Sequence, residues 1–273
     1  MATEPQKLGG PPPTEVPLQD PPLVRVLSQI RFPPILSIRN EDKTADFQES
    51  IRSSYPYLKP EKLQNVRFSD GSDPEYNETF VWRFEDSEEE PGWRVSLGVD
   101  FVSLETSKYK SREDFLKRLE HVIKATEEAF DPAAVNRLGL RYIDRLTGDA
   151  VREISDLVEP QLLGIYSPDN GPLSSLRRAM RYAQTEAMFE TEEGIIQARW
   201  AFLPSRTTYD PSALEPIEEE SWILDLDMFT ASREDFKTDH LNKVVTGFAE
   251  RIYFVFRKMV TDEFLRYYGG NVK

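Results

Sequence analysis

The chain has no cysteine among its 273 residues and only two histidines, His121 and His240. Without cysteine, disulfides, thiolate zinc sites and a cysteine nucleophile are excluded, and two histidines exclude metal sites that need three. No apolar run approaches the roughly 18 residues that a membrane span needs. The first 20 residues contain no apolar segment of the kind found in secretory signals. We therefore expect a soluble cytoplasmic protein without membrane association.

Basic residues are fewer than acidic residues in this chain. The chain has 34 Lys plus Arg against 48 Asp plus Glu, a formal net charge of −14. A chain this acidic repels nucleic acid unless a local basic surface overrides its field. The balance therefore argues against a nucleic-acid partner, and the length is sufficient for a substantial core.

Alternating apolar and polar residues predict strands, and apolar stripes with a period of 3.6 predict helices. Strands are expected at 24–32, 63–69, 79–85, 93–105, 135–146, 175–190, 195–203 and 221–229. Helices are expected at 43–55, 112–130, 152–166 and 234–267. This order is typical of an α+β fold with antiparallel sheets covered by long helices on one face.

The pentapeptide Ser-Arg-Glu-Asp-Phe occurs at 111–115 and again at 232–236. Serine is a good N-cap, so each copy is predicted to open a long helix. Both halves then have the order β-α-β-β-β-α, with Trp93 matching Trp222 and Asp100 matching Asp227. We interpret this as an internal duplication: a disordered proline-rich arm at 1–20, a first repeat at 21–132 and a second at 133–273, integrated into one domain. The alternative is that capping chemistry favours Ser-x-x-Asp and the repeat is coincidental.

Several segments carry a family resemblance. They include Pro-Pro-Leu-Val at 21–24, Ile-Arg-Phe-Pro-Pro at 30–34, Asp-Phe-Val-Ser-Leu-Glu-Thr at 100–106 and Leu-Gly-Leu-Arg-Tyr-Ile-Asp-Arg at 138–145. Together they resemble a sporadically distributed, uncharacterised family of prokaryotic proteins of about this length. The resemblance spans nearly everything after the arm and implies one family-wide domain. It brings no catalytic residues.

Arginines gather on two of the expected strands. Arg137, Arg141 and Arg145 share one face of the strand at 135–146, and Arg25 and Arg31 share a face of the strand at 24–32. If a duplicated fold brings these strands together, up to five guanidiniums form one patch. Guanidinium forks suit phosphate and carboxylate groups, so a small anionic, nucleotide-like ligand is one hypothesis. The alternatives are local pairing with carboxylates and a surface for a protein partner.

Aspartates alternate along the strand at 221–229. Asp225 and Asp227 share a face there, and Asp100 is the expected first-copy counterpart of Asp227. Carboxylates two residues apart can bind a divalent metal or act as acid and base, although exposed strand faces explain the pattern equally well. We find no Ser-His-Asp order, phosphate-binding loop or Gly-x-Gly-x-x-Gly segment.

The sequence thus favours a non-enzymatic binding or interaction protein that recognises a protein partner, a second copy of itself or a small anionic ligand, with no cofactor. The alternative is an enzyme that acts on a phosphorylated or carboxylated substrate through these Asp and Arg groups.

Overall fold

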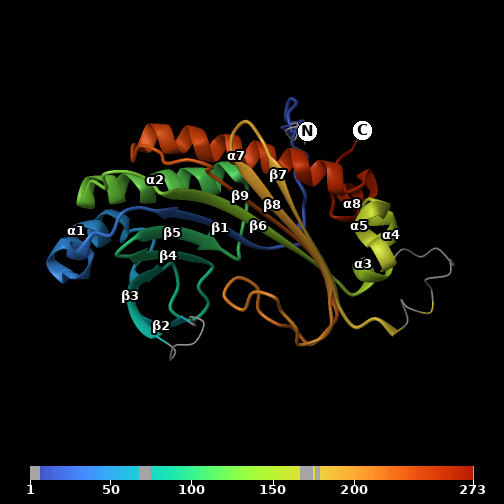
Figure 1. Ribbon diagram of the computed structural model, residues 1–273, viewed down its shortest axis with the longest axis horizontal. Coiled ribbons are helices and arrows are strands. Elements are labelled where there is room, and N and C mark those ends of the chain that lie inside the picture. Colours follow the sequence, from blue (N-terminus) through green and yellow to red (C-terminus); the bar gives the residue numbers. More distant parts are fainter. Residues whose placement is uncertain (1–6, 68–74, 167–174, 176–178, 273) are drawn as a thin grey trace, which may run out of the picture. The chain divides into compact units, whose positions relative to one another are not determined.

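The computed structural model describes residues 7–67, 75–166, 175 and 179–272. Within these residues the chain is an α+β protein with a large antiparallel sheet, whose strand order is β2-β3-β4-β5-β1-β6-β9-β8-β7 (Figure 1). The strands are β1 (Leu23–Arg31), β2 (Tyr57–Arg67), β3 (Glu75–Glu85), β4 (Trp93–Gly98), β5 (Phe101–Thr106), β6 (Arg137–Thr147), β7 (Ala183–Glu190), β8 (Ile195–Leu203) and β9 (Ser221–Phe229). The predicted α+β class with an antiparallel sheet is confirmed.

The described helices include two long ones and several short ones. They are η1 (Leu36–Arg39), α1 (Glu41–Ile51), α2 (Arg112–Phe130), α3 (Asp149–Arg152), α4 (Ile154–Leu157), α5 (Pro160–Leu163), η2 (Gly164–Tyr166), α7 (Thr238–Met259) and α8 (Asp262–Tyr267). The contacts divide the chain into unit 1 (Met1–Val26, Leu140–Phe229 and Thr246–Lys273) and unit 2 (Leu27–Gly139 and Thr230–Val245). The division falls inside β1, β6 and α7, and so differs from the two sequence repeats.

Unit 2 contains a meander of β2, β3, β4 and β5, each antiparallel to the next. The register places Phe84 beside Val95, so Phe84 and Trp93 project from the same face. Two helices pack on that face: Phe47 of α1 contacts Phe84, and Phe115 of α2 stacks on Trp93. These contacts form the core of the unit, because all four side chains are buried.

Unit 1 contains the meander of β7, β8 and β9. Ile196 and Ala198 lie opposite Met228 and Leu226 in the register, and all four are buried. The alternate positions of β8 and β9 include Arg199 and Asp225, which therefore project from the other face. The 204–220 loop lies on the opposite side of β8 and β9 from α7 (Figure 1). Each face of this part of the sheet is thus covered by a different element.

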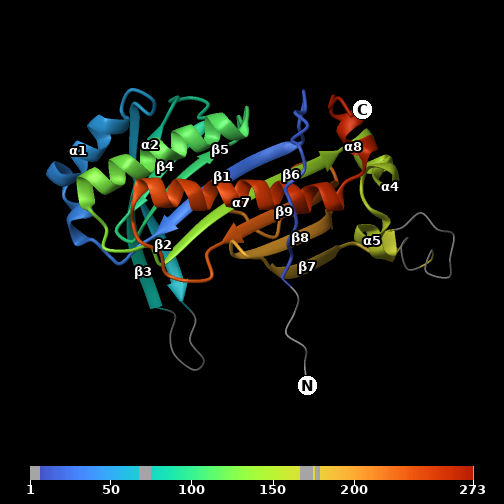
Figure 2. The ribbon, with the colours of Figure 1, turned by 90° about the horizontal axis from the view of Figure 1, so that it is seen from above.

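The described part of the N-terminal arm crosses α7 and reaches the end of α8 (Figure 2). Leu8 N–H donates to the Glu190 carbonyl over 2.8 Å, and Val16 N–H donates to the Tyr253 hydroxyl over 2.8 Å. Farther along, Gln19 N–H donates to the Tyr268 carbonyl over 3.0 Å. The segment expected to be disordered therefore has backbone partners from residue 8 onward, while residues 1–6 lie outside the described residues.

The second pentapeptide does not open a helix, so that prediction is wrong. Ser111 accepts from Asp114 N–H and caps α2 as expected. Ser232 instead precedes an extended stretch in which Glu234 bridges Val135, and α7 begins only at Thr238. The carboxylate of Glu127 accepts from Thr238 N–H over 2.9 Å and so supplies the cap at this end. A distant side chain has replaced the local cap.

Two other elements are divided where one was expected. The strand at 93–105 is the hairpin of β4 and β5, with Val99 and Asp100 in its turn. The helix at 234–267 is interrupted at Val260, which bridges Val158, and Thr261 then caps α8 by accepting from Phe264 N–H. The strand at 175–190 begins only at Ala183, and part of its expected first half lies outside the described residues.

The strand order changes the expected correspondence between the repeats. In the sheet, β1 and β6 are neighbours, β5 lies on the outer side of β1, and β9 lies on the outer side of β6. From β5 and from β9 a meander then continues to the edge of the sheet. If the halves are duplicated, this order would match β9 with β5 rather than with β4, and Trp93 of β4 would then not correspond to Trp222 of β9. Internal duplication remains a prediction, now with a different alignment.

Candidate functional site

Arg141 of β6 lies at the centre of an ion-pair network in unit 1. Its Nε and Nη2 donate to the two carboxylate oxygens of Asp225, each over 2.8 Å, and its Nη1 donates to Asp210 over 2.8 Å. The Arg141 side chain is 13% exposed and that of Asp225 is fully buried. This bidentate geometry is the strong form of an arginine–carboxylate pair.

Two further side chains complete the shell of Asp225. The Tyr209 hydroxyl donates to Asp225 over 2.8 Å, and Arg199 approaches it at 3.4 Å while donating to Glu186 over 2.6 Å. Burial, followed by the charge of Asp225, raises the pKa of Tyr209 above its usual value. Burial alone would lower the pKa of Arg141, but the hydrogen bonds and charges of Asp225 and Asp210 raise it. Both groups therefore keep their protons at neutral pH, and the network is saturated by its own members.

Two other arginines of the predicted ligand-binding set bind the 204–220 loop. Arg25 donates to the Ser212 carbonyl over 3.1 Å, and Arg145 donates to the Glu215 carbonyl over 2.6 Å. Burial lowers the pKa of Arg145. Beneath the loop, a small apolar cluster joins the loop residues Ala213 and Leu214 to sheet residues, namely Ile143, Ala201, Leu203 and Ile223. Three of the five predicted ligand-binding arginines thus hold a loop in place.

The other two arginines belong to unit 2. Arg31 donates to the Gln29 side chain over 3.0 Å and lies 3.9 Å from Asp100. The guanidinium of Arg137 lies against Gly139 of the same strand. Arg31 and Arg137 are therefore placed in a different unit from Arg25, Arg141 and Arg145.

The three predicted metal-binding aspartates do not form one cluster. Asp100 occupies the β4–β5 turn in unit 2, Asp225 is bound by Arg141, and Asp227 lies opposite Gln197 in the β8–β9 register. Among the residues that the structure describes, no group of three or more His, Asp or Glu side chains could hold a metal ion. The geometry gives these aspartates no support as a metal site.

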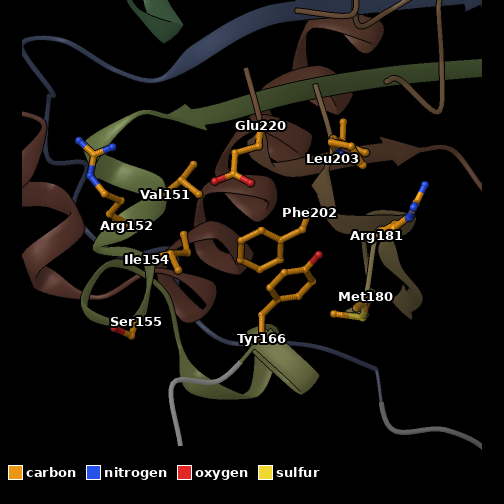
Figure 3. Close-up of a pocket in the computed structure, with 11 residues that line it drawn as sticks. Val151, Arg152, Ile154, Ser155, Tyr166, Met180, Arg181, Phe202, Leu203 and Glu220 are labelled. Carbon is orange, nitrogen blue, oxygen red and sulfur yellow. The ribbon is translucent and has the colours of Figure 1, made fainter. Parts of the chain in front are cut away.

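A hollow of about 550 Å³ lies elsewhere in unit 1 (Figure 3). Its wall comes from α3, α4, the end of η2, the end of β8, the two ends of the 204–220 loop and residues just before β7. Tyr166 and Phe202 stack there with ring centroids 3.5 Å apart and planes at 24°. Apolar side chains make up most of the remaining wall, namely Val151, Ile154, Met180, Leu203 and Pro204. The hollow thus combines an aromatic and aliphatic wall with four polar residues, namely Arg152, Ser155, Arg181 and Glu220.

The polar groups of the hollow differ in direction. In Figure 3 the Glu220 carboxylate points into the hollow above Phe202, whereas the guanidiniums of Arg152 and Arg181 point away from its centre. Arg152 also forms an ion pair with Asp149, its neighbour on α3. The charge that faces the interior is therefore negative.

No pattern in the sequence predicted this hollow. Its residues come from five separated segments, and no period links Tyr166 with Phe202 or Glu220. The partners of Asp225 were missed for a similar reason, because the register that brings Arg199 beside Asp225 depends on strand pairing.

No protein-family model matches the chain, and no curated protein sequence matches it. The resemblance to a sporadic prokaryotic family therefore stays a prediction. Within the described residues, no helix combines the length and apolar character that crossing a membrane requires.

Proposed function

We propose that the protein is a non-enzymatic binding protein that takes a small, largely apolar organic ligand into the hollow of unit 1. One observation carries the proposal: a concave site of about 550 Å³ in which seven of the eleven lining residues are aromatic or aliphatic. Small-molecule sites in proteins have volumes of roughly 300–1,000 Å³ and this kind of lining, with a few polar groups that orient the ligand.

The stacked rings supply the main contact surface. Aromatic side chains bury large areas at little conformational cost, and offset stacking extends to a planar ligand placed against them. Ile154 is buried beside them and gives the wall an aliphatic side. A ligand with a flat or apolar body would therefore gain most of its affinity from this wall.

The arginine network supports this site indirectly. Pro204 and Glu220, the two ends of the 204–220 loop, line the hollow, and the middle of the loop is held by Arg141 and Arg145. Fixing the loop keeps this part of the wall in place before a ligand arrives, and preorganisation reduces the entropic cost of binding. This reading gives the arginines a structural role in a binding protein.

An enzymatic function has less support. Asp225 is enclosed by donors, and neither Asp225 nor Asp100 is among the residues that line the hollow. A partner protein on the arginine-bearing face is also less favoured, because the 204–220 loop already contacts Arg25, Arg141 and Arg145.

A fluorescence titration with N-phenyl-1-naphthylamine, a neutral apolar dye, tests the proposal. Val151 points into the hollow (Figure 3), so Val151→Trp should fill it and weaken dye binding at least about tenfold. Val272→Trp, a matched change near the C-terminus, should leave binding unchanged. If the dye does not bind, or if Val151→Trp binds it as well as the Val272→Trp control, the hollow is not the ligand site.

A further inference from the structure

The hollow contains a carboxylate directed at an aromatic wall. Glu220 is the last residue of the 204–220 loop, directly before β9, and its carboxylate points inward above Phe202, which stacks on Tyr166 (Figure 3). A carboxylate attracts a cation, and an aromatic face attracts a cation through its quadrupole. The carboxylate and the aromatic rings therefore both favour a positively charged ligand.

The nearby arginines do not reverse this preference. Arg152 is engaged by Asp149, and in Figure 3 both Arg152 and Arg181 direct their guanidiniums away from the centre of the hollow. An anion held in the hollow would have the Glu220 carboxylate facing it. Repulsion by that carboxylate would oppose its binding.

The charge of the chain acts in the same direction. The formal net charge is −14, and Glu218 and Glu219 directly precede Glu220. A field of this sign raises the local concentration of cations and lowers that of anions. The long-range attraction and the contacts within the hollow therefore both favour a cation.

We propose that the ligand of this hollow is an organic cation: a protonated amine or quaternary ammonium group carried on a flat, apolar body. The body lies against the Tyr166–Phe202 wall and the positive charge lies beside Glu220. This inference rests on the proposed function, which supplies the site, and adds the chemical class. It replaces the anionic ligand expected from the arginines of the sheet.

Three dyes of similar size and different charge separate the alternatives. They are thioflavin T, a planar cation; N-phenyl-1-naphthylamine, which is neutral; and 8-anilinonaphthalene-1-sulfonate, an anion. The dissociation constant of each is measured by fluorescence with the full chain. We expect thioflavin T to bind more tightly than the sulfonate.

The decisive variant is Glu220→Gln, which removes the charge and keeps the shape. It should weaken thioflavin T binding roughly three- to tenfold, the range expected of a partly exposed charge contact together with a cation–aromatic contact. Neutral dye binding should stay within about twofold, because it depends on the apolar wall. Glu219→Gln is the matched control, since it changes the net charge equally without lining the hollow. Glu220→Lys should invert the preference in favour of the sulfonate.

Two results would overturn the cationic class. One is tighter binding of the sulfonate than of thioflavin T by the native protein. The other is an equal effect of Glu220→Gln and Glu219→Gln on thioflavin T. Either result, with neutral dye binding still lost in Val151→Trp, would leave the proposed function intact. Loss of neutral dye binding by the native protein would overturn both proposals. Melting temperatures of all variants verify that each is folded.

Discussion

Replacing Asp144 by asparagine is expected to stabilise the protein above neutral pH and to have little effect in acid. Asp144 lies on β6 in unit 1, and 7% of its surface is exposed. Burial raises the pKa of its carboxyl to about 7, from an ordinary value of 3.8. Burial, with smaller contributions from Tyr267, Asp144 and Asp20, also raises the pKa of the nearby Tyr268 hydroxyl.

The size of the effect follows from the difference in proton binding. Between pH 4 and pH 7 the folded state holds the Asp144 proton and the unfolded state releases it. Stability therefore falls as pH rises through this window and stays lowered above pH 7. A displacement of about three pKa units corresponds to on the order of 4 kcal/mol. Asparagine has nearly the same shape and never ionises, so the variant escapes this cost.

Urea denaturation followed by tryptophan fluorescence from pH 4 to pH 9 measures the difference. The free energies of unfolding of Asp144→Asn and the native protein should agree within about 1 kcal/mol at pH 4, and the variant should lead by roughly 2–4 kcal/mol at pH 8.5. Asp239→Asn, an exposed substitution, controls for removing one negative charge from an acidic chain. A gap that fails to widen with pH, or a variant less stable at pH 8.5, would contradict the raised pKa of the buried Asp144 carboxyl.

Three further substitutions test other parts of the structure. Arg141→Met leaves the buried Asp225 carboxylate without its main partner and should lower the free energy of unfolding in urea by about 3–5 kcal/mol. Combining it with Asp225→Leu should recover much of this loss. An unchanged stability of the single variant would contradict the network. Glu127→Ala should lose about 1–2 kcal/mol at pH 7 because it removes the cap of α7. Hydrogen bonds from Lys237 and Thr238 lower the pKa of Glu127 to about 2, so the deficit should shrink as pH falls from 4.5 toward 2, and a constant deficit would argue against the cap. Gly194→Ala should lower stability by roughly 1–3 kcal/mol, because a Cβ there would collide with the Phe229 carbonyl and crowd Phe248, and a neutral result by thermal melting would contradict this packing.

Local periodicity was sufficient for much of the fold. Alternation located strands close to β1, β8 and β9, and the apolar stripe with the Ser111 cap located α2. These signals lie within a few residues of the elements they specify. The α+β class followed from them because each element buries one face.

Distant contacts account for what the sequence did not predict. The Ser232 pentapeptide resembles a helix start, but Glu127 caps the helix at Thr238 instead, from more than a hundred residues away. The divided last helix depends on the bridge between Val158 and Val260. Tertiary partners of this kind override local capping preferences, and a single sequence does not show them.

The candidate site shows the same limit more strongly. The sequence identified arginines on one face of β6, yet the partners of Arg141 and Arg145, Asp210 and Glu215, belong to a loop with no period. These arginines form a structural network if the loop already binds them, and a ligand patch if it does not. The path of the loop therefore decides between the two interpretations. The aromatic hollow became visible only when separate segments were placed together.

A crystal structure of the protein with thioflavin T would show directly whether the hollow binds an organic cation. We expect the dye in the hollow, with its rings against Tyr166 and Phe202 and its charged end beside Glu220. Dye bound elsewhere, such as on the face that carries Arg141, with nothing in the hollow, would contradict it.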